Sequence, residues 1–316
     1  MLDKHITALR GRLGGGELCL FCGAGTSLAA NVPTWQGLLQ RLLFRMFQGR
    51  AASAGRSRVD HYLSEAFGRL FAPSPLIVAR YLKNALGDGL NQHVLDAIYS
   101  NNPTGSPLLS AIGDLCDSGS SRPRLRAVLT YNFDDLIETE LEGKGIGHLS
   151  IDGPGQKPTG DDLPIYHPHG FLPRGCVDPS KKRIVLAEDE YHSQFMTPFD
   201  WSNVVQVSLL TQHTCLLVGL SLTDPNMRRL LDFAHRLNSG GSSSAGSQQH
   251  YIVLKRHRID EISKDLRPRL ADNLLQEFID EVHDVQERDA KSLGLSVLWV
   301  DEYEELTSVL EAIRGP

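Results

Sequence analysis

The stretch ELCLFCGAG, residues 17–25, joins an uninterrupted apolar run to two closely spaced glycines. Similar apolar runs occur at CLLVGL, residues 215–220, and at YIVL, residues 251–254. Strands with one face in water alternate apolar and polar residues, whereas continuous apolar strands are typical of a parallel sheet that helices cover on both faces. These runs therefore predict an α/β fold built on a doubly wound parallel sheet.

Five segments are predicted as strands of this sheet: Glu17 to Phe21, Leu125 to Thr130, Thr214 to Val218, His250 to Leu254 and Leu295 to Val300. Between the first two, about a hundred residues show mostly helical patterns, too many for an ordinary crossover. These patterns cover Trp35 to Phe47, Asp60 to Phe71, Pro75 to Leu86, Asn91 to Tyr99 and Ser106 to Cys116. We therefore expect an inserted, mostly helical subdomain at 35–122, and a Rossmann-like sheet domain made of residues 1–34 and 123–316.

Three later segments have other patterns. The region Gly153 to Asp200 is rich in Pro and Gly, so it is expected to add an irregular lobe near the mouth of the sheet. Residues 238–249, NSGGSSSAGSQQ, are expected to form a flexible surface loop, with a functional lid as the alternative. The helix expected from Asp272 to Leu293 should pack on the sheet through Leu275, Phe278, Ile279, Val282 and Val285.

The composition is typical of a folded, soluble protein. Of 316 residues, 41% are hydrophobic and 22% are charged, and no apolar stretch approaches the ~20 residues that a membrane helix needs. The N-terminus lacks the apolar segment of a signal peptide, and five cysteines, an odd number, favour reduced thiols. We therefore expect a cytoplasmic protein without membrane attachment. The net charge of −6 argues against bulk nucleic-acid binding, so no direct binding to nucleic acid is expected.

The glycines at residues 23–25 directly follow the first strand, where glycine lets the backbone approach a phosphate closely. A dinucleotide fingerprint would add Gly or Ala at position 28 and an acidic residue ~20 positions later. The chain has Leu28 there instead, followed by the basic residues Arg41 and Arg45. An ordinary nicotinamide-dependent dehydrogenase is therefore disfavoured.

The residues after these glycines do not lead straight into a helix. Asn31-Val32-Pro33 interrupts the pattern, so residues 25–34 are expected to form a long loop that can fold over a ligand. Thr34 is a suitable N-cap for the helix that follows. Trp35 begins the apolar stripe of that helix, which favours core packing over stacking on a ligand.

Three further motifs are expected at the sheet edge where ligands of open α/β sheets bind. In TYNFDD, residues 130–135, Asn132 and Asp134 can reach this edge, although an aspartate there can instead cap the next helix. In IYHPHG, residues 165–170, a histidine precedes a glycine that permits an unusual backbone angle. In GLSLTDP, residues 219–225, a glycine and a serine lead into a helix start that suits a phosphate or ribose.

Together, these motifs resemble the sirtuin (silent-information-regulator) family, and more closely its zinc-free bacterial relatives than the protein deacetylases. The resemblance covers most of the chain, from about Glu17 to Trp299, although the helical insert carries no matching motif. The matching residues are Gly23, Ala24, Gly25 and Ser27 of the Gly-Ala-Gly-x-Ser loop, Thr130, Asn132 and Asp134 of Thr-Gln-Asn-Ile-Asp, His169-Gly170 of the catalytic His-Gly, and Gly219-Leu220-Ser221 for Gly-Thr-Ser. The family's Ile-Pro-Asp-Phe-Arg segment is altered here to Val32-Pro33-Thr34-Trp35-Gln36.

The resemblance implies cleavage of the bond between nicotinamide and ribose in NAD, and here hydrolysis of NAD to nicotinamide and ADP-ribose. The implied catalytic residues are Asn132, which suits holding a water or a ribose hydroxyl, and His169, which suits a general base. His167 is the alternative base, because two histidines two residues apart on an extended segment point the same way. The glycine after His169 favours His169.

NAD-binding residues are also implied by the resemblance: Gly23, Ala24, Gly25, Thr26, Ser27, Pro33, Asp134, Gly219, Ser221 and Asp224. Asp134 would hold the nicotinamide carboxamide. The amides of residues 24–27 and the turn at 219–221 would hold the pyrophosphate and the adenosine ribose. For Asp224, capping of the next helix is an equally good explanation.

No metal site is expected. Deacetylases of the family hold a structural zinc with two Cys-x-x-Cys pairs, but after His169 this chain has only Cys176 and Cys215. Cys19 and Cys22 have pair spacing, yet they lie in a predicted strand, which favours buried thiols. The missing zinc lobe also weighs against a groove for an acyl-lysine peptide.

Bacterial proteins of this resemblance commonly deplete NAD in antiphage defence. Because uncontrolled NAD hydrolysis would be toxic, the resemblance implies control by homo-oligomer formation or by a partner chain, such as a HerA-type hexameric translocase ATPase or an Argonaute-like protein. Two other function classes stay open: an NAD-dependent deacylase or ADP-ribosyltransferase, and a catalytically silent scaffold that binds NAD or ADP-ribose.

Overall fold

The structure is a computed structural model, and it describes residues 2–51, 66–67, 74–117, 119, 125–239, 249–262 and 270–315. Most of the helix predicted over Asp60 to Phe71, and the centre of the loop predicted over 238–249, lie outside the described residues. All five predicted strands are present, with ends shifted by at most two residues. Two further strands, one of them inside the region predicted to be irregular, were not predicted.

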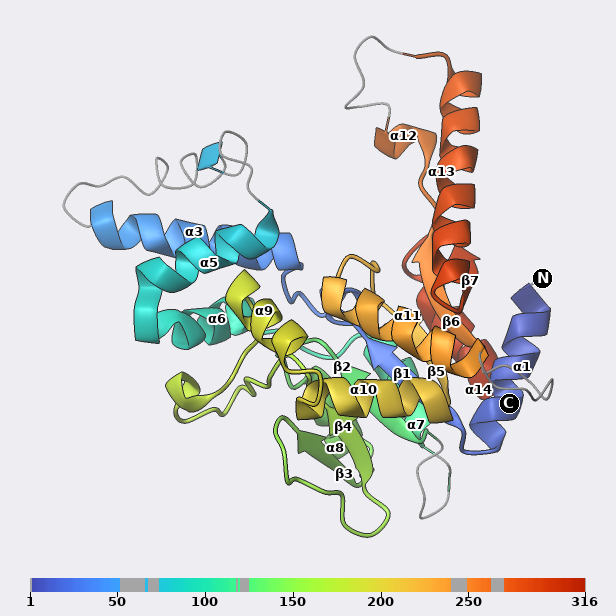
Figure 1. Ribbon diagram of the computed structural model, residues 1–316, viewed down its shortest axis with the longest axis horizontal. Helices are drawn as coiled ribbons and strands as arrows, with labels where there is room; N and C mark the ends of the chain where they lie inside the picture. Colours follow the sequence, from blue (N-terminus) through green and yellow to red (C-terminus); the bar gives the residue numbers. More distant parts are fainter. Residues whose placement is uncertain are drawn as a thin grey trace.

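The described residues form a seven-stranded sheet in the order β3-β4-β2-β1-β5-β6-β7, in which neighbouring strands are parallel (Figure 1). The strands are β1 (Leu18–Cys22), β2 (Ala127–Thr130), β3 (His148–Ile151), β4 (Leu163–Tyr166), β5 (Thr214–Val218), β6 (His250–Lys255) and β7 (Leu295–Val300). The chain starts in the middle with β1, builds one side of the sheet, and then crosses to β5 on the other. This order confirms the doubly wound α/β fold, and the crevice at the carboxyl end of β1 is its topological switch point.

Alternate residues of β1 enter two different cores. Leu18, Leu20 and Cys22 belong to the core on one face, whereas Cys19 and Phe21 belong to the core on the other. The first face is covered by α1 (Leu2–Gly14), α7 (Pro107–Cys116), α8 (Leu136–Gly143) and α14 (Glu305–Arg314), and the second by α10 (Trp201–Gln212), α11 (Pro225–Ser239) and α13 (Asp272–Ser292). Burial on both faces explains why the sequence of β1 is apolar throughout.

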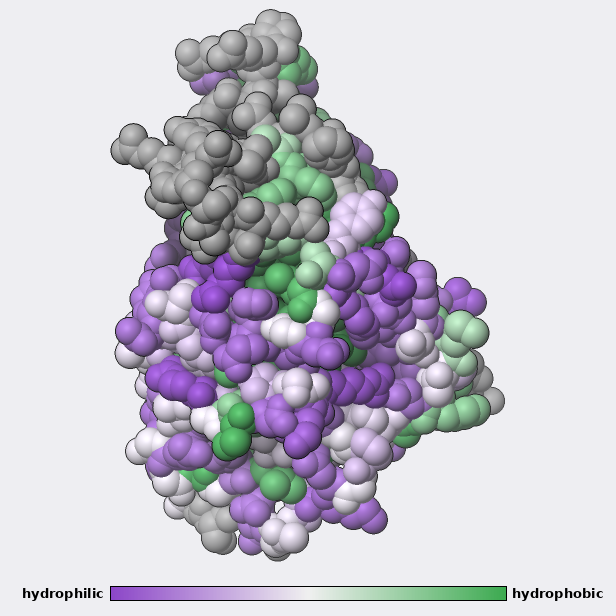
Figure 2. All heavy atoms as spheres, turned by 90° about the vertical axis from the view of Figure 1, so that its left-hand side faces the viewer, coloured by the Kyte–Doolittle hydropathy of each residue, from purple (hydrophilic) through white to green (hydrophobic). Residues whose placement is uncertain are grey.

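A second group of helices lies beyond the carboxyl edge of the sheet, at the left of Figure 1. It comprises α3 (Trp35–Ala51), α5 (Pro75–Leu86), α6 (Leu90–Tyr99) and α9 (Glu188–Met196), with the short turns η1 (Gly87–Gly89) and η2 (Pro179–Lys181). Seen from that side, the surface is mainly hydrophilic, with apolar side chains gathered in its upper part (Figure 2). The predicted helical subdomain at residues 35–122 stays a prediction. Helix α7 lies within these bounds, but it packs against α8 and α14.

Two other expectations need correction. Residues 25–34 are not entirely loop, because Gly25–Leu28 form one helical turn, α2; Thr34 does cap α3, since its Oγ1 atom accepts a hydrogen bond from the amide of Gly37 (3.1 Å). In α13, Phe278 is 54% exposed and Val285 is 51% exposed. At 100° per residue, these two positions lie at the edge of the apolar stripe, outside its contact with β7.

A short helix, α12 (Ile259–Ile262), follows β6 and packs against α13. Within the ranges that the structure describes, no helix is both long enough and apolar enough to span a bilayer.

Candidate active site

The loop after β1 packs directly against the loop after β5, at the switch point of the sheet. A Cβ atom on Gly23 would lie 2.5 Å from Gly219 O, and one on Gly25 would lie 2.7 Å from Gly219 Cα. Gly219 has a φ of +67°, and its own Cβ would lie 2.6 Å from the amide nitrogen of Thr26. The glycines of both motifs are therefore required by the close approach of the two backbones.

Most amides of this loop already have partners within the protein. The Gly25 amide donates to Gly219 O (3.0 Å), that of Thr26 to Gly23 O (2.9 Å), and that of Ser27 to Ala24 O (3.2 Å). These three amides are therefore engaged in holding the loop. The predicted phosphate contact of residues 24–27 stays a prediction, and Ala24 is the member of this set that lines the cavity described below.

Asn132 follows β2 and is tied to the same loop. Its Nδ2 atom lies 3.1 Å from Gly23 O, 2.9 Å from Ser27 Oγ and 3.2 Å from Thr26 Oγ1. Because a backbone carbonyl can only accept a hydrogen bond, the contact with Gly23 fixes which end of the amide faces the loop. The Oδ1 atom of Asn132 has no hydrogen-bond partner among the described residues, so it is left to accept a hydrogen bond from a ligand.

Asp134 is buried beside the same loop. Its Oδ1 atom accepts hydrogen bonds from Ser27 Oγ and from the amide of Leu136, each at 3.2 Å, so it also caps the start of α8. Burial raises the pKa of Asp134 to about 6, although these two hydrogen bonds act in the opposite direction. Asp135, the other capping candidate, instead accepts a hydrogen bond from the amide of Arg174 (2.7 Å).

His169 lies in an almost fully buried position between two tyrosine rings. The ring centroid of Tyr131 is 4.8 Å away and that of Tyr191 is 5.7 Å away, both with edge-on geometry. The Nε2 atom of His169 lies 3.5 Å from Asp224 Oδ2 and makes no hydrogen bond. Burial lowers the pKa of His169 below its usual value, and the charge of Asp224 offsets this only in part, so the ring is neutral at pH 7.

Asp224 caps the next helix and also lines the cavity, while its predicted contact with NAD stays a prediction. Its Oδ1 atom accepts a hydrogen bond from the amide of Met227 (2.7 Å) and so caps α11. Its Oδ2 atom accepts a hydrogen bond from the hydroxyl of Tyr191 (2.6 Å) and faces His169. The capping carboxylate is thereby positioned within the site.

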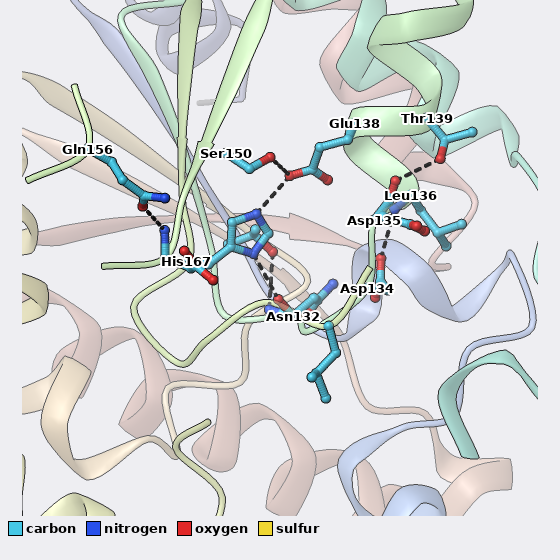
Figure 3. A network of polar contacts seen from close by, with 12 residues as sticks. Asn132, Asp134, Asp135, Leu136, Glu138, Thr139, Ser150, Gln156 and His167 are labelled. Atoms are coloured by element: carbon cyan, nitrogen blue, oxygen red, sulfur yellow. Dashed lines mark hydrogen bonds and ion pairs between the residues drawn. The ribbon is translucent and has the colours of Figure 1, made fainter. Parts of the chain in front are cut away.

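His167 does not point the same way as His169, contrary to the expectation for an extended segment. The chain turns at this point, because the amide of Gly170 donates to His167 O (3.0 Å) and Gly170 has a φ of +103°. His167 is buried on the far side of the turn, where its ring contacts Glu138 (Figure 3). His169 is therefore the histidine of this motif that reaches the cavity.

A cavity of about 430 Å³ opens where the two groups of helices and the sheet edge meet. Of the predicted site residues, it is lined by Gly23, Ala24, Pro33, Asn132, Asp134, His169 and Asp224. Gly25, Thr26, Ser27, Gly219 and Ser221 are not in its lining; the first four hold the lining residues in place, and Ser221 Oγ contacts Thr223 Oγ1 (2.8 Å). Trp35 packs against the core, as favoured, and also lines the cavity; its stacking on a ligand stays a prediction.

Sequence reasoning missed two tyrosines of the site. Tyr131 stands where the family motif has Gln, and its hydroxyl donates to Gln206 Oε1 (2.6 Å) while its ring faces His169. Tyr191 comes from α9, in a region that carries no motif. The departure at position 131 was visible in the sequence, but no local signal marked Tyr191.

Comparison with known proteins identifies the family of this chain. The SIR2-like domain family matches residues 126–292, more than half of the chain. This chain belongs to the SIR2-like domain family. The match begins just before β2 and includes the strands and turns that carry Asn132, His169 and Asp224.

Three curated relatives align with this SIR2-like chain at low identity. Defense-associated sirtuin 2 of Bacillus subtilis is 23% identical over 70% of the chain and 20% of its own length. The NAD(+) hydrolase ThsA of Enterococcus faecium is 23% identical over 95% of the chain and 55% of its own length. The protein of the same name from Bacillus cereus is 26% identical over 59% of the chain and 36% of its own length. The chain thus spans only part of each relative.

Four of the five cysteines of this SIR2-like chain lie on three elements, β1, β5 and α7. Cys19 of β1 and Cys215 of β5 are neighbours in register, Cys22 ends β1, and Cys116 lies in α7. In the part of the chain that the structure describes, no group of three or more His, Cys, Asp or Glu side chains is arranged to hold a metal ion.

Proposed function

We propose that this SIR2-like chain hydrolyses NAD to nicotinamide and ADP-ribose, and that it does so in the cytoplasm. Two relatives are named NAD(+) hydrolases, which supports the proposed reaction. The observation that carries the proposal is the Nε2 atom of His169, which is buried, lacks a hydrogen bond and borders the same cavity as Asn132. An unpaired polar atom in such a place is available to hydrogen-bond a ligand or a water. The cavity volume lies in the range of small-molecule sites.

The proposed reaction breaks the bond between C1′ of the ribose and the ring nitrogen of nicotinamide. Nicotinamide leaves with the bonding electron pair, which neutralises its pyridinium charge, and the ribose becomes oxocarbenium-like. A water oxygen then bonds to C1′, and its proton passes to the neutral His169. The lowered pKa of His169 supports this role, because a base must be unprotonated before it can accept a proton.

In this proposal, only the oxygen of the Asn132 side chain contacts the ligand or the water. Since Nδ2 is occupied by Gly23, Thr26 and Ser27, only Oδ1 is available, and it accepts a hydrogen bond from the attacking water or from a ribose hydroxyl. Asp134 would contact the nicotinamide carboxamide. With a pKa of about 6, its ionised form accepts from the carboxamide NH₂ group at neutral pH.

The test measures NAD consumption and identifies the products by mass spectrometry for the wild type, Asn132→Ala and His169→Ala. Loss of the base or of the water-holding amide should lower turnover by about 10²–10⁴-fold. The exposed residues Asn101 and His192 provide matched controls, and Asn101→Ala and His192→Ala should retain wild-type turnover. Turnover that survives in His169→Ala would refute the site.

The products also separate the alternatives. Free nicotinamide with ADP-ribose is the expected result. NAD-dependent loss of acetyl from a lysine peptide would favour a deacylase, and ADP-ribose attached to a protein would favour a transferase. Tight NAD binding with no turnover, in the purified protein and in extracts of cells that express it, would favour a silent scaffold.

We also propose that the activity serves antiphage defence and is controlled by assembly, since one relative is named a defence-associated sirtuin. Control would come from a homo-oligomer or from a partner chain such as a translocase ATPase or an Argonaute-like protein. Light scattering of the purified protein tests the first case. A monomer that is fully active without any other component would contradict control by assembly.

A further inference from the structure

A buried polar network lies directly behind Asn132 (Figure 3). His167, at 0% exposure, places its Nε2 atom 2.7 Å from Glu138 Oε1 and its Nδ1 atom 3.3 Å from the backbone oxygen of Asn132. Glu138 Oε1 also accepts a hydrogen bond from Ser150 Oγ (2.8 Å). The network thus connects α8 and β3 to the loop that carries Asn132.

The partners of His167 determine which of its ring nitrogens carry protons. The backbone oxygen of Asn132 can only accept a hydrogen bond, so Nδ1 must donate to it. A carboxylate can also only accept, so Nε2 must donate if Glu138 is ionised. The contact with Asn132 therefore fixes Nδ1 as a donor, and one proton, on Nε2 or on Glu138 Oε1, joins the other two atoms.

Glu138 is buried in the first turn of α8, where the helix dipole favours a negative charge. Burial raises the pKa of Glu138, and its contacts with His167 and Ser150 act in the opposite direction. Its Oε1 atom contacts both of these side chains, whereas its Oε2 atom is buried without a hydrogen-bond partner.

The other charged group that acts on this pair is Asp134, on the loop before α8. Cys22, at the end of β1, is the further titratable group near both carboxyl groups, and burial raises its pKa, so it stays a neutral thiol. Ser150 and the ring of Phe171, whose centroid is 4.2 Å from that of His167, are the uncharged neighbours. Glu138 is thus the carboxyl group that lies at hydrogen-bond distance from His167.

We propose that His167, held in place by Glu138, is a positioning residue that fixes the backbone of Asn132. The side chain of Asn132 is anchored to the loop after β1 through Nδ2, and its backbone is anchored from the opposite side by His167. Together the two anchors define where Oδ1 meets the ligand. His167 does not touch the cavity, so it acts only through Asn132.

Two substitutions separate the two hydrogen bonds of His167. In His167→Asn, the amide nitrogen lies near the position of Nδ1 and keeps a donor for Asn132, but it leaves the buried Glu138 unpaired. In His167→Gln, the amide nitrogen lies near the position of Nε2 and keeps a donor for Glu138, but it leaves the Asn132 carbonyl without one. A buried unpaired charge costs more stability than an unpaired carbonyl, so His167→Asn should have the lower Tm.

The expected order of activity is the reverse of the order of stability. His167→Gln should lower kcat by about 100-fold with KM for NAD changed by less than roughly threefold, because a misplaced Asn132 affects the reaction more than binding. His167→Asn should stay within about 10-fold of the wild type. If His167→Asn fails to fold, adding Glu138→Gln removes the buried charge and keeps the donor. Activity that simply follows Tm would overturn the proposal.

This kinetic test rests on the proposed NAD hydrolysis, so a second measurement is independent of it. Nitrogen-15 NMR of histidine-labelled protein reports the protonation of each ring nitrogen, and the His167→Asn or double-variant spectrum assigns the signals of His167. A proton on Nδ1 is expected; an Nδ1 atom without a proton would overturn the proposal. If the wild type consumed no NAD while Nδ1 carried a proton, the proposed function would fail and the positioning contact would stand.

Discussion

At the residue scale, the site depends on how buried neighbours set the chemistry of His169. Its ring lies edge-on to Tyr131 and Tyr191, and the hydroxyl of Tyr191 holds Asp224 Oδ2 in place. Burial lowers the pKa of His169, and the charge of Asp224 raises it in part. The net effect keeps His169 unprotonated at neutral pH, as the proposed role of a base requires.

This balance predicts a pH effect of Asp224→Asn. In the proposed reaction His169 must be neutral, so kcat/KM should rise with pH through the pKa of His169, which lies below the ordinary value of about 6.5. Removing the charge of Asp224 lowers this pKa further and should move the acid limb of the profile to lower pH. Asn is as good a helix cap as Asp, so α11 should keep its start.

The control for this profile is Asp232→Asn, which removes a carboxylate on α11 that pairs with Arg236. Its acid limb should match that of the wild type. An acid limb of Asp224→Asn that stays in place or moves to higher pH would contradict the assignment of His169 as the base.

That His169 and not His167 reaches the cavity was predicted mainly from the family resemblance, with Gly170 as the supporting local signal. The structural feature that makes the two side chains point apart could not be predicted. It is the turn closed by the Gly170 amide, together with a Glu138 that reaches His167 from another helix. Such a contact depends on how α8 lies against the turn, and no local pattern of residues specifies it.

At the element scale, the packed turns after β1 and β5 position the cavity wall. The substitution Gly219→Ala combines a positive φ with a Cβ atom 2.6 Å from a backbone nitrogen, so it should destabilise the fold by about 2–5 kcal/mol. Gly11→Ala is the matched control, since Gly11 lies within α1 with no atom near its Cβ position, and it should stabilise by about 0.5–1 kcal/mol. Urea unfolding measures both, and a Gly219→Ala protein as stable as the wild type would contradict the close packing.

The inner strands could be predicted because both of their faces are buried. β3 and β4 escaped prediction since each has only four residues and carries part-exposed positions, and β4 includes Pro164. Their apolar content is therefore too low to distinguish a strand from the Pro- and Gly-rich surroundings. β3 pairs with β4, and β4 pairs with β2. These pairings join separate segments of the chain, so no local pattern specifies them.

At the scale of the whole molecule, ion pairs connect the outer helices to the site. Asp189 on α9 lies 2.8 Å from Arg80 and 2.6 Å from Lys83 on α5, and Lys83 also pairs with Glu190. The next residue of α9 after this pair is Tyr191, which lines the cavity and holds Asp224. The position of α5 is thus linked to the geometry around His169, and nothing in the helical segment of the sequence marked this link.

The substitution Asp189→Asn should break these ion pairs and leave the position of Tyr191 less well fixed. Because these ion pairs are about one-third exposed, their loss should cost no more than about 1 kcal/mol of stability. We expect KM for NAD to rise roughly two- to fivefold at low salt, and the difference from the wild type should shrink at high salt. Steady-state kinetics at two salt concentrations measure this, with Asp232→Asn as the control; a KM unchanged at low salt would contradict the link.

The central claim is that this site transfers water to the ribose of NAD. The most direct measurement is the reaction of the wild type with NAD in water labelled with oxygen-18, followed by mass spectrometry. The account predicts free nicotinamide and one heavy oxygen in ADP-ribose for each NAD consumed. Nicotinamide release without label in ADP-ribose, or no release in the purified protein and in extracts of cells that express it, would contradict the account.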